Sequence, residues 1–332
     1  MAAPQRKHDT EASLPRGLIF DAVSVCEAAA IASAQLRGLG DEKAADQVAV
    51  DSMRRALNTL PIRGTIVIGE GERDEAPMLY IGETVGLGTG PAIDIALDPL
   101  EGTTITAKSL PGAMTTIAFA TEGGFLHAPD VYMYKLAVGP DVPFGVMDVD
   151  LSVADNLARL AEAKGATVAD MTVCILDRPR HEQLIADVRA TGARISLIDD
   201  GDVSAVIAVA DPNSGIDMYI GSGGAPEGVL AAAALRCLGG HIIGKLLFRN
   251  DEERARAKKA GITDLDRKYS TMDMASGHVL FAATGVTSGN LVQGVRFNRN
   301  VAMTHSVVMD SRAGQVRMVE TVHPDYPVLA RG

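Results

Sequence analysis

The stretch that decides the fold is AIDIALDPLEGTT, at residues 92–104. Its apolar first half, residues 92–97, predicts a buried strand, and the following Asp98-Pro99 ends that strand. Glu101 comes three residues after Asp98, across a turn that the proline stiffens. Both carboxylates can therefore point to one place beyond the strand end, as oxygen ligands of a cation would.

The turn continues into Gly102-Thr103-Thr104, a glycine followed by two hydroxyl side chains. Such a sequence lets backbone N–H groups approach a phosphate closely. The Thr103 hydroxyl can also hold a water molecule, and Asp74 can accept the Thr103 proton so that this water is polarised for attack on phosphorus. Because a metal ion already makes bound water more acidic, these two side chains mainly have to position it.

Three other acidic positions accompany this turn. Glu70 lies in the run GEGERDE at residues 69–75, directly after a predicted strand. Glu227 follows the glycine-rich residues 221–224, and Asp46 lies inside a predicted helix. Carboxylates at strand ends meet at the edge of a sheet, where they repel one another unless cations lie between them. Hard oxygen ligands of this kind suit Mg²⁺ or Mn²⁺.

Each acidic position also has a plainer interpretation when it is taken alone. The run at residues 69–75 can be a solvated turn, since turns favour polar residues. Glu227 can simply complement the dipole in the first turn of a helix, and Asp46 can be an ordinary helix residue. These interpretations weaken when four positions must be explained together, so we expect one cation-binding cluster.

Outward from this stretch, the sequence alternates between helical and strand periodicity. Two helices, beginning near Leu18 and after the capping Asp41, precede a β-rich first half. The second half alternates strands with helices, which is typical of βαβ units and a parallel or mixed sheet. We expect a domain boundary near residue 150. The predicted strands are 65–68, 92–97, 114–120, 131–138, 172–176, 194–198, 216–220, 279–283, 302–309 and 316–322, and the later helices are 154–163, 181–190, 203–209 and 226–238.

The composition predicts a folded, soluble protein. Of its 332 residues, 47% are hydrophobic, which is ample for a large core, and no apolar run reaches membrane-spanning length. The net charge of -11 repels nucleic acid, so neither nucleic acid nor a membrane is an expected partner. The polar N-terminus leads us to expect no signal peptide, and the widely spaced Cys26, Cys174 and Cys237 indicate reduced core thiols. We therefore expect a cytoplasmic protein.

A basic motif, Arg178-Pro179-Arg180-His181, follows a predicted strand and opens a helix. Two arginines in an acidic protein suit a phosphate that is far from the cation cluster. The alternative is an ordinary salt-bridged helix start. We expect His181 to be a cap or a core partner rather than an acid.

Asp200-Gly201-Asp202 follows the next strand, and its carboxylates are good acceptors for sugar hydroxyls, with a simple Asx turn as the alternative. Tyr132 can contact a sugar or its phosphate, or it can be a core residue. Together with the arginines, these residues indicate a substrate with two anionic ends.

Six motifs in unbroken order resemble the class II (GlpX-type) fructose-1,6-bisphosphatases. The resemblance covers roughly residues 15–322. The shared Asp-Pro-x-Glu-Gly-Thr element is also similar to that of the lithium-sensitive phosphatases, which usually have Asp at the position of Glu101 and a Trp before the motif. This chain has no Trp, which favours the class II branch over the inositol phosphatases. The motifs are IVIGEGE (66–72), DPLEGT (98–103), APDVY (128–132), DRPRH (177–181), DGDV (200–203) and GGAPEG (223–228).

The resemblance implies a role for each motif residue. Asp46, Glu70, Asp98, Glu101 and Glu227 are the implied metal ligands, and Thr103 with Asp74 matches the water-activating pair. The implied substrate contacts are Glu101, Gly102, Thr103, Tyr132, Arg178, Pro179, Arg180, Asp200, Gly201, Asp202 and Gly224.

The implied fold is an α/β (α+β layered) sugar-phosphatase fold, with alternating layers of helices and sheets in two domains. Residues 1–150 would form the metal and catalytic domain and residues 151–332 the sugar-phosphate-binding domain. The implied reaction is Mn²⁺- or Mg²⁺-dependent hydrolysis of the 1-phosphate of fructose 1,6-bisphosphate, in carbohydrate metabolism (gluconeogenesis or the Calvin cycle). A homo-oligomer, dimer or tetramer, is implied as well. The alternatives are a dual fructose-1,6-/sedoheptulose-1,7-bisphosphatase, an inositol or nucleotide phosphatase, and a non-catalytic sugar-phosphate-binding regulator.

Overall fold

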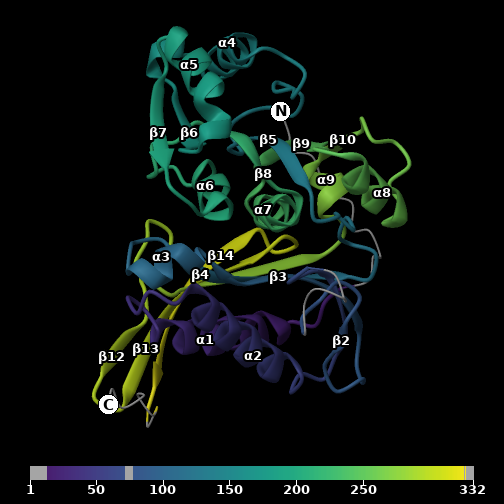
Figure 1. Ribbon diagram of the computed structural model, residues 1–332, viewed down its shortest axis with the longest axis vertical. Helices are drawn as coiled ribbons and strands as arrows, with labels where there is room; N and C mark the ends of the chain where they lie inside the picture. Colours follow the sequence, from purple (N-terminus) through teal and green to yellow (C-terminus); the bar gives the residue numbers. More distant parts are fainter. Residues whose placement is uncertain (1–12, 72–77, 325, 327–332) are drawn as a thin grey trace.

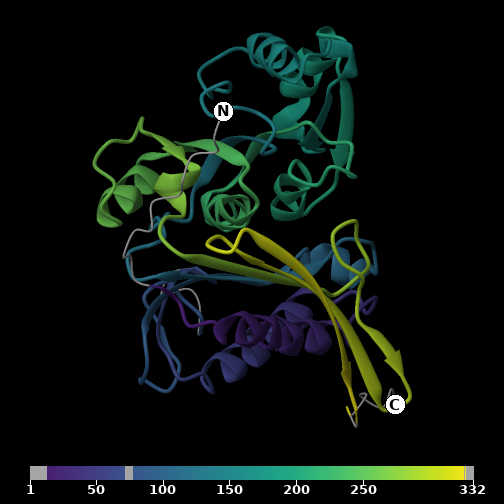
Figure 2. The same ribbon diagram turned by 180° about the vertical axis from the view of Figure 1, so that it is seen from behind.

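The computed structural model of the protein describes residues 13–71, 78–324 and 326. Two sheets are stacked with helices below, between and above them, so the molecule is built of alternating layers (Figures 1 and 2). This confirms the expected layered α/β fold class. No helix in the described part of the chain is long and apolar enough to cross a membrane.

The first sheet takes its strands from both ends of the chain. In its described part it has eight strands, in the order β12-β13-β11-β4-β3-β1-β2, with β14 paired to β13. β3 lies between the parallel β1 and the antiparallel β4. The strands are β1 (Arg63–Ile68), β2 (Thr84–Val85), β3 (Ala92–Glu101), β4 (Met114–Thr121), β11 (Val279–Gly285), β12 (Arg296–Asn298), β13 (Val301–Asp310) and β14 (Gln315–His323).

The second sheet is formed by the strands that lie between β4 and β11 in the sequence. Its order is β10-β9-β5-β8-β6-β7, and it is mixed, because β6 is parallel to β7 and β8 while β5 is antiparallel to β8 and β9. The strands are β5 (Tyr132–Val138), β6 (Thr172–Leu176), β7 (Arg194–Ile198), β8 (Met218–Gly224), β9 (His241–Leu247) and β10 (Lys268–Ser270).

The helices divide among the three remaining layers. Below the first sheet lie α1 (Leu18–Ala34) and α2 (Glu42–Leu57), and above the second sheet lie α4 (Val153–Lys164) and α5 (Glu182–Ala190) (Figure 1). α7 (Ala225–Leu238) runs between the sheets and touches both. Its alanine-rich sequence is buried all round, as a helix in the middle layer requires. The others are α3 (Thr103–Lys108), α6 (Asp202–Ala208), α8 (Asp251–Lys259) and α9 (Thr271–Met274).

The sequence predictions hold for most elements, including the Asp41 cap, whose side chain accepts a hydrogen bond from the Ala44 N–H. The buried thiols of Cys26, Cys174 and Cys237 are free, as expected. β9 and α3 were not predicted, and neither were the short β2, β10, β12 and α9. The division into two domains at residue 150 stays a prediction, and sheet membership follows another division, since the strands from Val279 onward belong to the first sheet.

Candidate active site

β3 ends in a bulge that carries the Asp98 and Glu101 carboxylates. The pairing between β3 and β4 shifts between Asp98 and Glu101, because Pro99 cannot donate a ladder hydrogen bond. The Leu100 N–H donates to the Asp98 carboxylate at 3.0 Å, and the Thr115 hydroxyl donates to the Pro99 carbonyl at 2.9 Å. The sequence predicted that the strand ends at Asp98-Pro99, but β3 continues to Glu101, and these two hydrogen bonds hold the bulge from both sides.

Gly102 follows with a left-handed backbone, φ +90°, and begins α3. A Cβ at this position would lie 3.1 Å from the Ile105 Cδ1 atom, so both the dihedral and the packing require glycine. The half-buried Thr103 is the first residue of α3. Asp74, its predicted partner in water activation, lies outside the described residues.

Separate elements bring Asp46, Glu70 and Glu227 to the same region. Burial, together with the charges of Asp46 and Glu227, raises the pKa of Glu70 to about 7. Burial also raises the pKa of Asp46 on α2. The pKa of Glu227 in the first turn of α7 is raised by burial and by Asp202, although Lys135 opposes the shift. Asp46 and Glu227 therefore lie close enough to Glu70 for their charges to raise its pKa, although they come from separate elements.

Asp98 and Glu101 complete this acidic cluster. Burial and the charges of Glu70, Glu101 and Glu227 hold the pKa of Asp98 well above its usual range. Burial and the Asp202 charge do the same for Glu101. We call Asp46, Glu70, Asp98, Glu101 and Glu227 the carboxylate cluster.

The carboxylate cluster is close enough for electrostatic coupling but is not a closed cage. In the described residues, no three His, Cys, Asp or Glu side chains converge tightly enough to hold a metal ion as they stand. One buried oxygen of Glu101 and one of Glu227, Oε2 in both, have no hydrogen-bond partner. Unpartnered carboxylate oxygens facing like charges are what a cation-binding cluster leaves when only protein atoms are present.

One hydrogen bond joins the cluster to the segment that begins α6, and one buried lysine joins two of the predicted sugar-binding residues to each other. The Val203 N–H at the start of α6 donates to Glu101 Oε1 at 2.9 Å. The fully buried Lys135 on β5 bonds to Asp202 Oδ2 at 2.5 Å and to the Gly224 carbonyl at 3.0 Å. Lys135 was not predicted from the sequence as a site residue. The one available signal was a lysine in the middle of an otherwise apolar strand.

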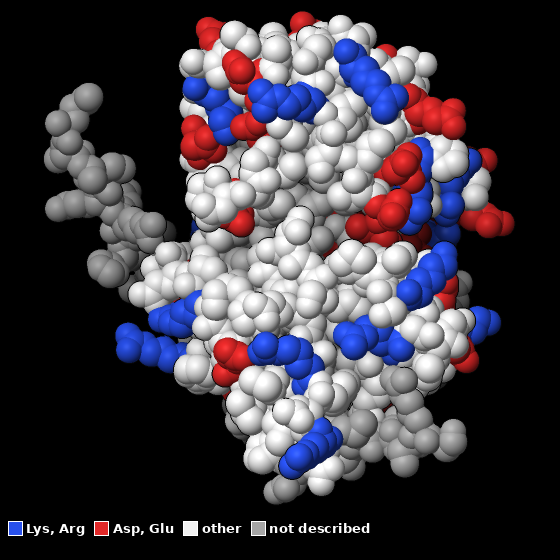
Figure 3. All heavy atoms as spheres, turned by 90° about the vertical axis from the view of Figure 1, so that its left-hand side faces the viewer, with Lys and Arg blue, Asp and Glu red and all other residues white. Residues whose placement is uncertain are grey.

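The basic motif lies on the second-sheet side of the site. Both Nε and Nη2 of Arg180 donate to the Ser222 carbonyl, at 3.0 and 2.9 Å. Arg178 lies 3.8 Å from Asp200, and Pro179 between the two arginines is exposed. Figure 3 shows arginines, lysines and acids gathered at the level where the two halves of the molecule meet.

His181 is a core partner, as predicted. Its Nδ1–H donates to the Leu176 carbonyl at 2.8 Å, and its Nε2 accepts from the Ser222 N–H at 2.9 Å. Burial lowers its pKa. The ring therefore fixes the backbone that carries the two arginines.

Tyr132 and Gly224 face each other across β5 and β8. A Cβ on Gly224 would overlap the Glu227 carboxylate, so the glycine makes room for a residue of the cluster. Gly201, with φ +84°, similarly turns the chain into α6 so that Asp202 points inward. The structure thus brings the described candidate residues together in one region.

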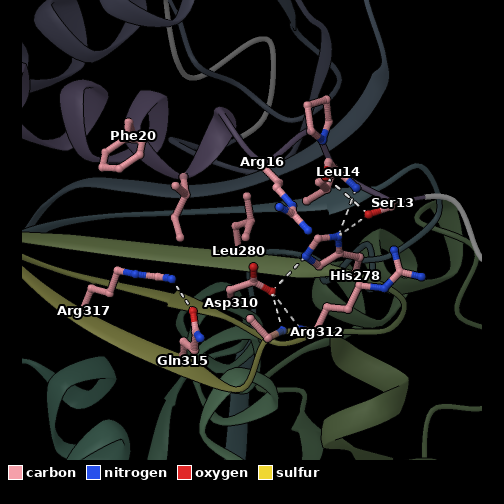
Figure 4. A pocket seen from close by; sticks show the side chains of 13 residues that line it. Ser13, Leu14, Arg16, Phe20, His278, Leu280, Asp310, Arg312, Gln315 and Arg317 are labelled. Carbon is pink, nitrogen blue, oxygen red and sulfur yellow. Dashed lines mark hydrogen bonds and ion pairs between the residues drawn. The ribbon is translucent and has the colours of Figure 1, made fainter. Parts of the chain in front are cut away.

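A separate cavity lies away from the carboxylate cluster. It measures about 740 Å³ and is lined by the start of α1 and by β11, β13 and the turn to β14 (Figure 4). Inside it, His278 Nδ1 accepts from the Leu14 N–H at 3.0 Å, while Nε2 lies 3.0 Å from Asp310. Because this cavity contains no residue of the carboxylate cluster, we do not place the chemistry there.

The layers and the carboxylate cluster at the strand and helix ends are those of an α/β phosphatase. The chain belongs to the family described as bacterial fructose-1,6-bisphosphatase, glpX-encoded, which it matches over residues 16–323.

Three cyanobacterial proteins of similar sequence share one name, D-fructose 1,6-bisphosphatase class 2/sedoheptulose 1,7-bisphosphatase. They come from Synechococcus sp. strain JA-3-3Ab, Synechococcus sp. strain JA-2-3B'a(2-13) and Trichodesmium erythraeum strain IMS101. Each is 46% identical to this chain over 329 aligned positions, which cover 92% of the chain and 94%, 94% and 95% of the relatives.

Proposed function

We propose that this protein hydrolyses the 1-phosphate of fructose 1,6-bisphosphate, giving fructose 6-phosphate and inorganic phosphate. The observation that carries the proposal is the coupling of carboxylates from α2, β3, α7 and the segment after β1. Membership of the fructose-1,6-bisphosphatase family supports the same reaction. The pathway, gluconeogenesis or the Calvin cycle, stays a prediction.

The residues of the carboxylate cluster fit a divalent cation, Mg²⁺ or Mn²⁺. Their raised pKa values and the unpartnered oxygens of Glu101 and Glu227 show a surplus of negative charge that a cation would offset. Asp46, Glu70, Asp98, Glu101 and Glu227 would hold the ions. The chemistry that such ions supply is neutralisation of phosphate charge and a more acidic attacking water.

The protein's own contribution at the reacting phosphate is to position the phosphate and the water. Gly102 exposes the backbone N–H groups at the start of α3 to the phosphate. The Thr103 hydroxyl orients the attacking water, and Asp74 accepts the Thr103 proton. An attack in line with the leaving sugar oxygen then breaks the phosphorus–oxygen bond.

The other end of the substrate is bound by the second-sheet side of the site. Arg178 and Arg180 would bind the 6-phosphate through charge-assisted hydrogen bonds. Asp200, Gly201 and Asp202 would accept the sugar hydroxyls, beside Tyr132, Pro179 and the Gly224 backbone. The links from Glu101 to Val203 and from Lys135 to Asp202 support one continuous substrate path.

Phosphate release tests this function. Purified protein with Mn²⁺ or Mg²⁺ should release phosphate from fructose 1,6-bisphosphate, and Asp98→Asn should lose most of this activity. If the protein binds the sugar phosphate but releases no phosphate with either ion, it is a binding protein and the hydrolase proposal fails.

Sedoheptulose 1,7-bisphosphate is a second candidate substrate, because all three relatives are named for both activities. The reacting ends of the two bisphosphates are alike, and the second sugar is one carbon longer. Comparing kcat/KM for the two bisphosphates decides whether the enzyme is dual.

We further propose that the protein acts in the cytoplasm as a homo-oligomer, a dimer or a tetramer. The three buried free thiols fit a reducing compartment. Exposed apolar side chains on β14, namely Val316, Met318 and Val322, support self-association.

A further inference from the structure

Arg249 lies at the same end of the second sheet as Tyr132. In the pairing of β5 with β9, Tyr132 faces Leu247, and Arg249 follows two residues later, next to Asn250, the N-cap of α8. The chain therefore carries Arg249 to the place where Gly224 and Tyr132 border the proposed substrate path. Nothing in the local sequence near Arg249 marked it as a site residue.

Two guanidinium groups stack on the Tyr132 ring. The Arg180 guanidinium carbon lies 5.1 Å from the ring centroid, and that of Arg249 lies 4.9 Å from it. The ring attracts both cations, but two cations gathered around one ring also repel each other. An anion that contacts both would offset this repulsion.

Arg249 is held in place by a buried acid on the following helix. Glu253 is fully buried, and its Oε1 atom accepts from Arg249 Nε at 2.6 Å and lies 2.5 Å from Nη2. Its Oε2 accepts from the Arg249 backbone N–H at 2.7 Å. Since a guanidinium has five N–H donors, this anchoring leaves donors for a ligand on the exposed side. The Arg180 guanidinium is likewise fixed, by the Ser222 carbonyl.

We propose that Arg249 is a third arginine of the distal-phosphate site, with Arg178 and Arg180, and that Glu253 is the residue that positions it. This inference rests on the proposed function, because it requires a bisphosphate whose second phosphate lies beside Tyr132. The ligand chemistry is a phosphate monoester dianion, which suits bidentate binding by guanidinium groups.

A comparison of two substrates tests the inference. Kinetics are measured with fructose 1,6-bisphosphate and with fructose 1-phosphate, which lacks the distal phosphate. Arg249→Met should raise KM for the bisphosphate about tenfold, the effect of losing a charge-assisted hydrogen bond at a partly exposed site. The kcat/KM ratio between bisphosphate and monophosphate should fall by the same factor.

Arg254→Met is the matched control. Arg254 is five residues along, stacks on Phe248 at 5.3 Å and lies 3.9 Å from Asp251. Arg254→Met removes one positive charge, as Arg249→Met does, but leaves the contacts of Tyr132 in place. The kcat/KM ratio between bisphosphate and monophosphate should therefore stay at the wild-type value. Glu253→Gln should lower the ratio in the same direction as Arg249→Met, and adding it to Arg249→Met should change the ratio no further.

Two different failures can be told apart. If the wild-type enzyme hydrolyses neither substrate, the proposed function fails. If the wild-type enzyme prefers the bisphosphate and Arg180→Met reduces that preference, but Arg249→Met leaves it unchanged, the function stands and the role of Arg249 is wrong. A lower melting temperature of Arg249→Met with an unchanged substrate ratio would likewise show a purely structural residue.

Discussion

Lys135 is a charged side chain that lies fully inside the protein, on a strand that is otherwise mostly apolar. Its ammonium group has two partners, the Asp202 carboxylate and the Gly224 carbonyl. Asp202 is itself buried and raises the pKa of both Glu101 and Glu227. Lys135 is therefore the internal cation that makes the second-sheet side of this acidic site possible.

Lys135→Met should lower the free energy of unfolding by about 3–5 kcal/mol, because it leaves Asp202 as a buried charge without its partner. Urea unfolding monitored by circular dichroism measures the change. Lys245→Met on the neighbouring β9 is the control, since Lys245 pairs with exposed acids and should cost less than about 1 kcal/mol. Equal losses in the two variants would contradict the role given to Lys135.

The raised pKa of Glu70 predicts how the stability of the metal-free protein changes with pH. Its folded pKa of about 7 lies above the ordinary value of 4.5, so the folded state holds a proton that the unfolded state releases. The resulting stability is fully present below pH 4.5 and is lost as the pH rises to 7. In EDTA, the melting temperature should therefore fall between pH 5.5 and pH 7.5.

Glu70→Gln is the control for this titration, since it removes the ionisable group and should flatten part of the slope. Saturating Mn²⁺ or Mg²⁺ should remove the loss at pH 7.5, because the ions then stabilise the charged cluster. A metal-free protein that becomes more stable as the pH rises over this range would contradict the assignment.

Among the elements, β3 and α3 decide the geometry of the reacting end. β3 delivers Asp98 and Glu101 through a bulge, and α3 begins directly after them at Gly102. Because the glycine has φ +90°, a side chain there would strain the start of α3 and displace the N–H groups that we propose to contact the phosphate.

Gly102→Ala should destabilise the protein by about 1–2 kcal/mol, the cost of a left-handed alanine, and should also lower kcat strongly. Gly123→Ala is the control: its φ is +79°, but a Cβ there meets nothing within 4 Å, so only the stability cost should appear. Thermal melts and phosphate release measure the two effects. If both variants kept full activity, the α3 start would not be part of the site.

Many of the strands, helices and site-bearing segments could be predicted from the sequence. The strand at residues 92–97, the acids after β1 and in α7, and the basic motif after β6 were all found from local patterns, since turn residues follow apolar runs. The predicted end of that strand at Asp98 was wrong, because β3 continues through a bulge to Glu101. β9 was missed, because His241, Gly244 and Lys245 interrupt its apolar pattern and its partners are distant. α3 was missed because three of its six residues are threonines, which favour strands.

Contacts between separate elements could not be predicted from local sequence patterns. The Glu101 bond to Val203 and the Lys135 bond to Asp202 join residues 102 and 67 positions apart. Only the packing of the two sheets against α7 and α6 creates them. The stacking of Arg249 on Tyr132 could not be predicted from the sequence for the same reason.

At the scale of the whole molecule, the site lies where the first-sheet and second-sheet halves meet, and β14 forms a separate surface. β14 pairs with β13 along its length and with no other described strand. Val316, Met318 and Val322 on it are about half exposed. An edge strand of nine residues with exposed apolar side chains on one face is a surface that another chain can cover.

If the proposed oligomer forms through β14, replacing Met318 and Val322 together by Glu should break it into smaller species, because the change places charges in an apolar contact. Size-exclusion chromatography with light scattering measures the mass. Phe144→Glu is the control, since Phe144 is 75% exposed and lies far from β14 in the sequence and on the other half of the molecule. An unchanged mass for the β14 variant would exclude this strand as the contact.

The central claim is that carboxylates from separate elements form one cation-binding cluster. Calorimetric titration of the protein with Mn²⁺ at pH 7, in two buffers of different ionisation enthalpy, tests it most directly. The account predicts saturable binding with proton release, since the raised pKa values leave carboxyl groups partly protonated before the ion binds. Saturable binding without proton release, or no binding at all, would contradict it.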